Sequence, residues 1–423
     1  MKLPGRVALH SIWPLAMLAM GSAAQSRTLD EAIAAALVHA PEITAADADA
    51  DAARARLEQA RAGRLPTAAV SGTIGYGRLD PQGFFGLGAA NVIPRSAQIT
   101  IEQSLFTGGR VSAGIGQATA EIAGAEASRI STRTQLILAA TQAYGDVLTA
   151  GRMVDQYDRL VGETTEIERQ ARLRYRAGES PSTDVSQARA RLAEARAGQA
   201  RAQGMLVSAK AHFSNLTGLE ATGLKPLPAN PPVPATLDEA MEAARHNNPI
   251  LAQAEAGLRA ARAAARGASA ERLPTVGAFA EGASVRDQFF PGYRADSATV
   301  GVRARWDLLT GGRVSGKIAE ASSKVRAADA RLIAARAQLE EQVISAFQDV
   351  RTMQLIEKAA GDQSTATAQA LESVRYEVRV GMKPQLDLLD AEREVLAAQT
   401  SMERARTDRI VAAYRLMALL GRP

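Results

Sequence analysis

The amino-acid sequence predicts a mainly α-helical protein that also contributes a small amount of membrane β-structure. Three observations predict this fold class. Two stretches, 108–177 and 311–380, lack proline and keep helical periodicity for roughly 70 residues each, which corresponds to on the order of 100 Å of helix. Four short segments alternate apolar and polar residues, as strands do. The whole order of segments occurs twice along the chain.

The first residues, 1–24, are expected to form a secretory signal peptide. Lys2 and Arg6 precede an apolar run at 7–20, and small residues follow as far as Ala24, which predicts cleavage after Ala24. This run is too short to span a bilayer, and no later stretch reaches the roughly 20 apolar residues that a membrane helix needs. We therefore expect the mature chain to leave the cytoplasm without a helical anchor.

Composition excludes several classes of function. The chain has no cysteine, which excludes disulfides, thiolate chemistry and an acylated N-terminal cysteine. Aromatic residues make up 4% of the chain, which suits long, closely packed helices better than a broad core. The net charge is +5, but acidic and basic residues alternate along the helices. This pattern indicates a solvated face, and we expect no nucleic-acid partner.

Internal duplication sets the expected domain organisation. The matching motifs are Thr-Leu-Asp-Glu-Ala at 28–32 and 236–240, Leu-Pro-Thr at 65–67 and 273–275, and Thr-Gly-Gly-Arg-Val-Ser at 107–112 and 310–315. We expect a first structural repeat at 25–223 and a second at 236–423. The residues between them, 224–235, are rich in proline and predict a stiff extended linker.

Each repeat is expected to run from helix through two strands to a long helical hairpin. Residues 28–64 read as helical and are split at Pro41. The other expected elements are strands at about 67–78 and 97–106 with a hairpin at about 108–218, and strands at about 275–286 and 298–308 with a hairpin at about 311–420. In the last strand Val300 and Val302 alternate with Arg303 and Arg305, which predicts one face toward lipid and one toward water.

Four strands cannot enclose a pore by themselves. The smallest membrane barrels need about eight strands, and an open sheet edge cannot face lipid. The strands of several copies are therefore expected to form one barrel together, so that two or three copies give about eight or twelve strands. The loops at Phe84-Phe85 and Phe289-Phe290 are expected to lie at the membrane interface, where aromatic residues collect.

The second helix of each hairpin carries a coiled-coil seam. The heptad positions are Val185, Ala188, Leu192, Ala195, Gln199, Ala202, Leu206, Ala209, Phe213 and Leu216, and then Leu388, Ala391, Val395, Ala398, Met402, Ala405, Arg409, Ala412, Leu416 and Leu419. Only Gln199 and Arg409 interrupt the apolar pattern. The alternative interpretation, a soluble periplasmic coiled-coil adaptor, explains these helices but leaves the four membrane-type strands without a role.

No arrangement of residues points to catalysis or to a bound cofactor. The three histidines beyond the signal segment, His39, His212 and His246, are not spaced as a metal pair. No Ser/His/Asp set or paired carboxylates with catalytic spacing stand out. We therefore expect neither an enzyme nor a cofactor or metal site.

Taken in order, the duplicated motifs resemble the TolC family of outer-membrane factors. The resemblance covers the mature chain, including turns around Gly178 and Gly381 that are followed by Asp184 and Asp387. It implies a homotrimer with a twelve-stranded barrel in the outer membrane, continuous with a periplasmic α-helical tunnel. It also implies a periplasmic adaptor and an inner-membrane transporter of ABC or RND type as partners. The implied function is an exit duct for secreted proteins or small toxic compounds.

The resemblance also implies roles for residues at the hairpin tips. Asp387 and Asp390, spaced i, i+3 on one helix face, match the carboxylates that narrow the periplasmic entrance. Thr183, Asp184 and Lys383 match links that hold the entrance shut. The turn residues implied in adaptor docking are Gly178, Glu179, Ser180, Gly381 and Met382. The sequence departs from the family at Val378, where an aromatic link residue is expected.

Overall fold

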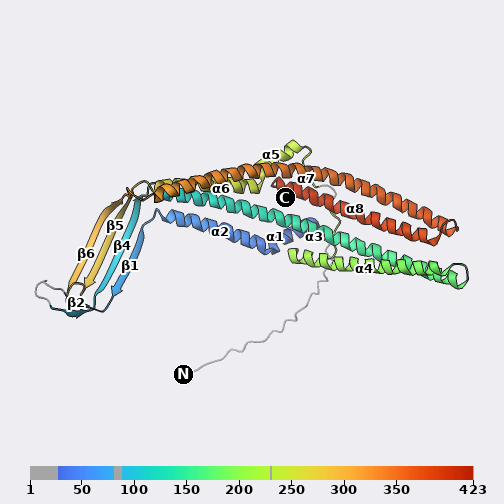
Figure 1. The fold of residues 1–423 in the computed structure, drawn as a ribbon, viewed down its shortest axis with the longest axis horizontal. Coiled ribbons are helices and arrows are strands. Elements are labelled where there is room, and N and C mark those ends of the chain that lie inside the picture. The colour runs from blue at the N-terminus through green and yellow to red at the C-terminus, as the bar shows by residue number, and fades with distance from the viewer. Residues whose placement is uncertain (1–26, 81–87, 229–230, 423) are drawn as a thin grey trace, which may run out of the picture.

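The computed structural model describes residues 27–80, 88–228 and 231–422. The molecule is elongated, with a sheet at one end, packed helices along the middle and two helical hairpins at the other end (Figure 1). The expected signal peptide and the Phe84-Phe85 loop lie outside the described residues. The fold class predicted from the sequence is confirmed, because long helices and a four-stranded antiparallel sheet make up the described chain.

Four shorter helices lie in two pairs, α1 (Leu29–His39) with α2 (Pro41–Ala62) and α5 (Leu237–Asn247) with α6 (Pro249–Ala270). Each pair breaks at a proline that occupies the first helical position, where its missing N–H costs nothing. Helix α1 begins with a capping box, since the Thr28 side chain accepts from the Glu31 amide and Glu31 accepts from the Thr28 amide. At the start of α5 the Thr236 side chain likewise accepts from the Glu239 amide, so the repeated Thr-Leu-Asp-Glu-Ala motif starts a helix in both repeats.

The main sheet has the strand order β1-β4-β5-β6, and every pairing in it is antiparallel. Its strands are β1 (Thr67–Ile74), β4 (Arg95–Phe106), β5 (Thr275–Arg286) and β6 (Arg294–Arg305). A small second sheet pairs β2 (Gly77–Leu79) with β3 (Ala90–Val92). Strands from both repeats therefore form one wall, in which β4 of the first repeat pairs with β5 of the second.

Two expected strands have different bounds in the structure. The strand expected at about 67–78 ends at Ile74, and the chain continues as β2, which pairs with β3 instead of β4. The strand expected at about 298–308 runs from Arg294 to Arg305. Apolar alternation continues beyond its end, but Trp306 leaves the ladder and its indole N–H donates to the Arg272 carbonyl (3.1 Å). Period-two alternation marks a face and does not mark where pairing stops.

Register gives the main sheet one apolar face and one polar face. Val300 lies beside Ala280, which lies beside Ile101, and Val300 is 83% exposed in the single chain. The large apolar side chains on this face include Val70, Ile74, Ile99, Ile101, Val300 and Val302. On the opposite face Gln98 donates to Glu281 (2.6 Å), and Arg303 pairs with Glu102 (3.4 Å). The alternation read from the sequence is therefore present across all four strands.

Four long helices form the two hairpins, α3 (Arg110–Arg176) with α4 (Ser182–Thr217) and α7 (Arg313–Arg379) with α8 (Gln385–Leu419). The glycines Gly109 and Gly312 precede α3 and α7 with φ of 90° and 85°, a backbone conformation that side-chain-bearing residues avoid. The repeated Thr-Gly-Gly-Arg motif is therefore a strand-to-helix junction. None of the described helices has the length and apolar character needed to cross a membrane.

Three apolar clusters hold the helices together. The largest joins α5, α6, α7 and α8 around Leu251, Val343, Phe347 and Leu416. A second surrounds Tyr144 and Phe213, whose rings meet edge to face with centroids 6.2 Å apart. There the Tyr144 hydroxyl lies 2.6 Å from the Lys225 carbonyl, so the start of the segment that joins the repeats is anchored to α3. The third cluster is small and lies near the hairpin tips.

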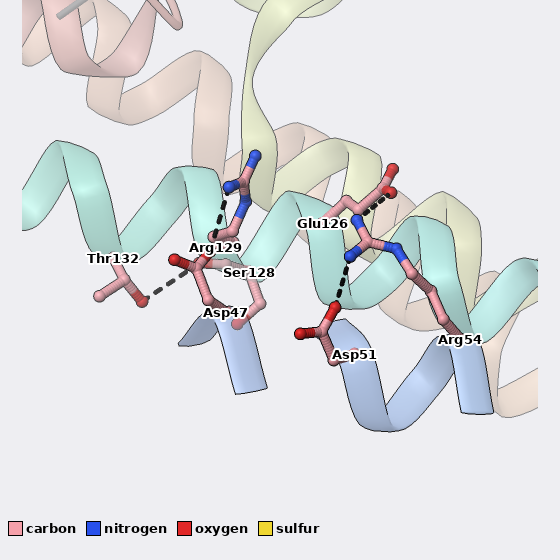
Figure 2. Close-up of polar contacts among 7 residues, drawn as sticks. All are labelled: Asp47, Asp51, Arg54, Glu126, Ser128, Arg129 and Thr132. Carbon is pink, nitrogen blue, oxygen red and sulfur yellow. Dashed lines mark hydrogen bonds and ion pairs between the residues drawn. The ribbon is translucent and has the colours of Figure 1, made fainter. Parts of the chain in front are cut away.

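Helix α2 is joined to α3 by ion pairs as well as by packing. Arg54 of α2 pairs with Glu126 of α3 (3.3 Å), and Arg129 of α3 pairs with Asp47 of α2 (3.0 Å), as Figure 2 shows. Arg54 also pairs with Asp51 of its own helix (2.7 Å). All five side chains are about half or more exposed, so these pairs fix the register of the two helices and add little stability.

Close packing of α3 against α4 leads to a prediction at Gly198. Its Cα faces the ring of Tyr157 so closely that a Cβ there would overlap the ring. We expect Gly198→Ala to destabilise the hairpin by about 1–3 kcal/mol, because overpacking forces the helices apart. Gly204 of the same helix has open space around it, so Gly204→Ala should be neutral or stabilising by up to about 1 kcal/mol. Thermal unfolding followed by the helical circular-dichroism signal measures the stability of both variants. Equal changes in stability for Gly198→Ala and Gly204→Ala would contradict the close packing of Gly198 against Tyr157.

Candidate functional site: the hairpin tips

Both hairpins turn on a glycine with positive φ, Gly178 at +78° and Gly381 at +79°. In the first turn the Glu179 amide donates to the Arg174 carbonyl (2.9 Å), and in the second the Met382 amide donates to the Glu377 carbonyl (2.8 Å). The next helix starts after a proline in each case, because Pro181 and Pro384 occupy the N-cap positions. The predicted docking residues therefore form two turns of matching geometry. Gly178, Glu179, Gly381 and Met382 are exposed, and Ser180 is partly buried.

The two tips contact each other through apolar side chains. Leu389 of α8 is buried against Ile167 of α3 and Ala188 of α4, and the surrounding residues are Ala171, Leu386 and Leu388. A cavity of about 60 Å³ beside them is lined by Asp184 and Ser180, among others, and the Ser180 hydroxyl finds no hydrogen-bond partner among the described residues. Asp184 therefore lies between the two hairpins, whereas the neighbouring Thr183 is exposed.

The two predicted entrance carboxylates lie in the first turns of α8. Asp387 is partly buried, and its amide donates to the Pro384 carbonyl (3.2 Å). Asp390 is exposed and pairs with Arg191 of α4 (3.2 Å). Of the two carboxylates, Asp390 therefore forms an ion pair within the same chain. A second ion pair between the same helices, Arg393 with Glu194 (3.4 Å), lies one turn further along α8.

Lys383 forms its ion pair within its own hairpin. Its ammonium lies 2.8 Å from the Glu377 carboxylate, and the hydrogen bond to Glu377 raises the pKa of Lys383, with a smaller contribution from Asp387. Within the described chain, no hydrogen bond or ion pair connects Lys383 to Thr183 or Asp184. A link between these predicted residues would have to form between neighbouring copies or in another state of the tips.

A charged cluster that the sequence analysis did not identify lies between the hairpin tips and the middle of the molecule. Glu392 of α8 is buried at 9% exposure, and its carboxylate lies 2.5 Å from the guanidinium of Arg375 on α7. The same guanidinium lies 3.2 Å from the carboxylate of Glu163 on α3. The pKa of Glu392 is raised to about 7, mainly by burial and also by the nearby Glu163 carboxyl, while Arg375 acts in the opposite direction. The heptad pattern singles out Ala391 and Val395, so nothing in the sequence marks Glu392 as buried.

The arrangement has the form of a wall and not of a catalytic pocket. A sheet continues into packed helices, which end in two hairpin tips (Figure 1). The sheet has one polar face, and the tips carry exposed carboxylates. Among residues 27–80, 88–228 and 231–422, no three His, Cys, Asp or Glu side chains are grouped so as to hold a metal ion. Such a wall can guide solutes past a polar surface when it is closed into a ring.

Comparison with known proteins gives the same fold and a family. The chain is 26% identical to the outer membrane efflux protein BepC of Brucella suis, over 77% of this chain and 71% of that protein. It is 26% identical to the outer membrane protein TolC of Vibrio cholerae, over 95% of this chain and 92% of that protein. The crystal structure of the outer membrane protein VceC of Vibrio cholerae matches with a TM-score of 0.79 at 20% identity, covering 93% of this chain and 96% of VceC.

A model of the outer membrane efflux protein family matches residues 32–219 and 240–422. Together the two segments include both hairpins and all four strands of the main sheet. The resemblance read from the duplicated motifs is confirmed by this match. The chain therefore belongs to the outer membrane efflux protein family, the TolC-type outer-membrane factors.

Proposed function

We propose that three copies of this chain form a continuous duct, with a twelve-stranded barrel in the outer membrane and a helical tunnel in the periplasm. Family membership makes the chain an outer-membrane channel protein with a large periplasmic part. The duct would receive substrates from an inner-membrane transporter of ABC or RND type through a periplasmic adaptor. Secreted proteins and small toxic compounds are the two substrate classes that we propose, and we propose no enzymatic activity.

One observation carries this proposal: the sheet is an open wall with two unpaired edges. Among the described strands, β1 pairs only with β4 and β6 pairs only with β5, so each end of the sheet presents free backbone groups. Lipid cannot satisfy these groups, because it has no hydrogen-bonding partners to offer. Pairing β6 of one copy with β1 of the next satisfies them and places the apolar face of every copy outside.

The entrance of the duct would lie at the hairpin tips. We propose that Asp387 and Asp390 line it and favour cations, since six carboxylates from three copies would surround a narrow axis. Thr183, Asp184 and Lys383 would link neighbouring hairpins in the closed state. The turns at Gly178, Glu179 and Ser180 and at Gly381 and Met382 would contact the adaptor.

Cross-linking between copies tests the shared wall directly, because the chain contains no cysteine of its own. We expect a pair of cysteines, one scanned along β1 and one placed at Ala298 of β6, to yield covalent dimers and trimers in outer-membrane fractions. The same scan along β4, which is already flanked by β1 and β5, should yield none. A soluble coiled-coil adaptor, the alternative function, would wash from the membrane without detergent and give no trimer with either scan.

A further inference from the structure

The two hairpins of one chain meet along an interface that is polar. We call this interface the polar seam, and it consists of Thr149, Arg152, Gln156 and Glu163 of α3 facing Thr407, Glu403, Gln399 and Glu392 of α8. The Thr149 and Thr407 hydroxyls lie 3.1 Å apart, and Arg152 forms an ion pair with Glu403. Gln156 donates to Gln399 (3.2 Å) and accepts from Thr400 (3.1 Å). The seam repeats every seven residues on α3, as a coiled-coil contact does.

Apolar contacts lie inside each hairpin and at both ends of the polar seam. Leu192 and Ala195 are buried residues of α4 in the first hairpin, and Val395 and Ala398 are buried residues of α8 in the second. Beyond the seam, Ile410 is buried with Tyr144 in one cluster, and Leu389 is buried with Ile167 near the tips. Separating the hairpins along the seam exchanges hydrogen bonds for water, whereas separating the helices of one hairpin exposes apolar surface. Parting the hairpins along the seam therefore leaves both hairpins intact, and it also opens the small cluster of Leu389 and Ile167 near the tips.

The lower end of the seam holds the charged cluster of Glu163, Arg375 and Glu392. Arg375 also pairs with Glu372 (2.9 Å), so one guanidinium forms ion pairs with three carboxyl groups. Arg159 of α3 lines the same hollow, which has a volume of about 370 Å³. On the side of α8 that meets α4, the charged groups Arg393 and Glu194 pair with each other, as do Asp390 and Arg191. With all three carboxyl groups ionised, they outnumber the two guanidiniums of Arg375 and Arg159, and Glu392 is the most buried of the three carboxylates.

We propose that this cluster is a proton-controlled fastener between the two hairpins, in which a proton shared by Glu163 and Glu392 holds α3 against α8 and loss of that proton releases the seam. A protonated Glu392 can donate to the Glu163 carboxylate, which removes the repulsion between the buried Glu392 carboxylate and the partly exposed Glu163 carboxylate. The fastener is a property of a single chain. That its release widens the entrance of the duct rests on the proposed function.

The direction of the pH effect follows from the raised pKa of Glu392. The packed hairpins hold the proton up to a pH of about 7, whereas a solvated Glu392 in parted hairpins would lose it near its ordinary value of 4.5. The packed state therefore binds more protons between these two values, and its stability falls as the pH rises through this window. Linkage predicts that the ratio of packed to parted hairpins drops about tenfold from pH 6 to pH 8.

Spin-label distances between the hairpins test the fastener. Gln187→Cys on α4 and Ala370→Cys on α7 introduce two exposed labelling sites in a chain without cysteine, and labelled subunits are diluted with unlabelled ones. We expect the distance distribution to shift toward longer values from pH 6 to pH 8. Glu392→Gln, whose amide can donate as the protonated acid does, should keep the short distance throughout. Glu163→Gln should move the midpoint of the shift below pH 7.

Glu403→Gln is the matched control, because it removes the ion pair with Arg152 in the same seam and keeps the charged cluster. It should lengthen the distances at every pH and retain the pH response. A wild-type distribution that is the same at pH 6 and pH 8, or a Glu392→Gln variant that responds like wild type, would overturn the fastener. Absence of a conducting channel alongside pH-dependent distances would instead count against the proposed function and leave the fastener in place.

Discussion

Val300→Arg is expected to prevent assembly of the protein in the outer membrane. Val300 lies near the middle of the 12-residue strand β6, on the apolar face of the sheet, and is almost fully exposed in the single chain. An Arg on the lipid-facing side of a barrel near the bilayer centre costs about 2–4 kcal/mol. Three copies would carry the substitution in every ring, for a total of about 6–12 kcal/mol, which is comparable to the stability of a whole domain. Immunoblotting of outer-membrane fractions measures the assembled protein.

The matched control is Thr299→Arg, one residue away on the opposite face. That face already contains Arg303, and Thr299 lies opposite Glu281 in the register of β5 and β6. An arginine there would point toward water and have a carboxylate nearby, so assembly should proceed. If both variants assembled equally well, the apolar face of the sheet would not be the face in contact with lipid.

Replacing both Asp387 and Asp390 by alanine is expected to abolish most of the cation selectivity of the channel. Carboxylates grouped at a constriction attract cations and repel anions, and three copies would lose six of them. Asp390 forms an ion pair with Arg191 of the same chain, whereas within the described residues Asp387 forms no ion pair and acts only through its charge on the nearby Lys383. Asp387→Ala alone should therefore reduce selectivity more than Asp390→Ala alone. Reversal potentials in a planar bilayer with a salt gradient measure all three variants.

Glu166→Ala serves as the control for this series. Glu166 is an exposed carboxylate of α3 that pairs with Arg169 (2.6 Å) and is not one of the residues assigned to the entrance. Its loss changes the net charge of the chain as much as either single aspartate variant does. Selectivity that falls equally with Glu166→Ala would mean that overall charge, and not the entrance aspartates, sets the preference for cations.

The sequence predicted the architecture because repeated local patterns determine it. The Thr-Gly-Gly-Arg junctions, the proline breaks at Pro41 and Pro249, and the glycine turns each act within a few residues, and the structure has a helix start, a helix boundary or a turn at each of them. Alternation in four strands likewise predicted which side chains share a face. Each of these patterns is local in the sequence, so it can be recognised without knowing which residues of other helices or strands pack against it.

Features that depend on contacts between distant segments were not predictable in the same way. The heptad series marked Gln199 as an interruption of the apolar heptad pattern of α4. The residue of α4 that is buried against Tyr157, however, is its neighbour Gly198. Arg409, the other interruption, is buried and forms an ion pair with Glu357 of α7. Glu392 finds its partner Arg375 17 residues away on α7, and Lys383 finds its partner Glu377 at the end of α7, on the other side of the same turn. A single heptad pattern describes one partner helix, whereas α8 packs against both α7 and α3.

The central claim is that this chain closes its wall only together with identical copies. Native mass spectrometry of the mature protein, released from detergent micelles after extraction from outer membranes, counts the copies in one particle. We predict a complex of three chains, which supplies twelve strands from a sheet of four per chain. A particle that contains a single chain would contradict the claim, because four strands with two open edges cannot form a channel in lipid.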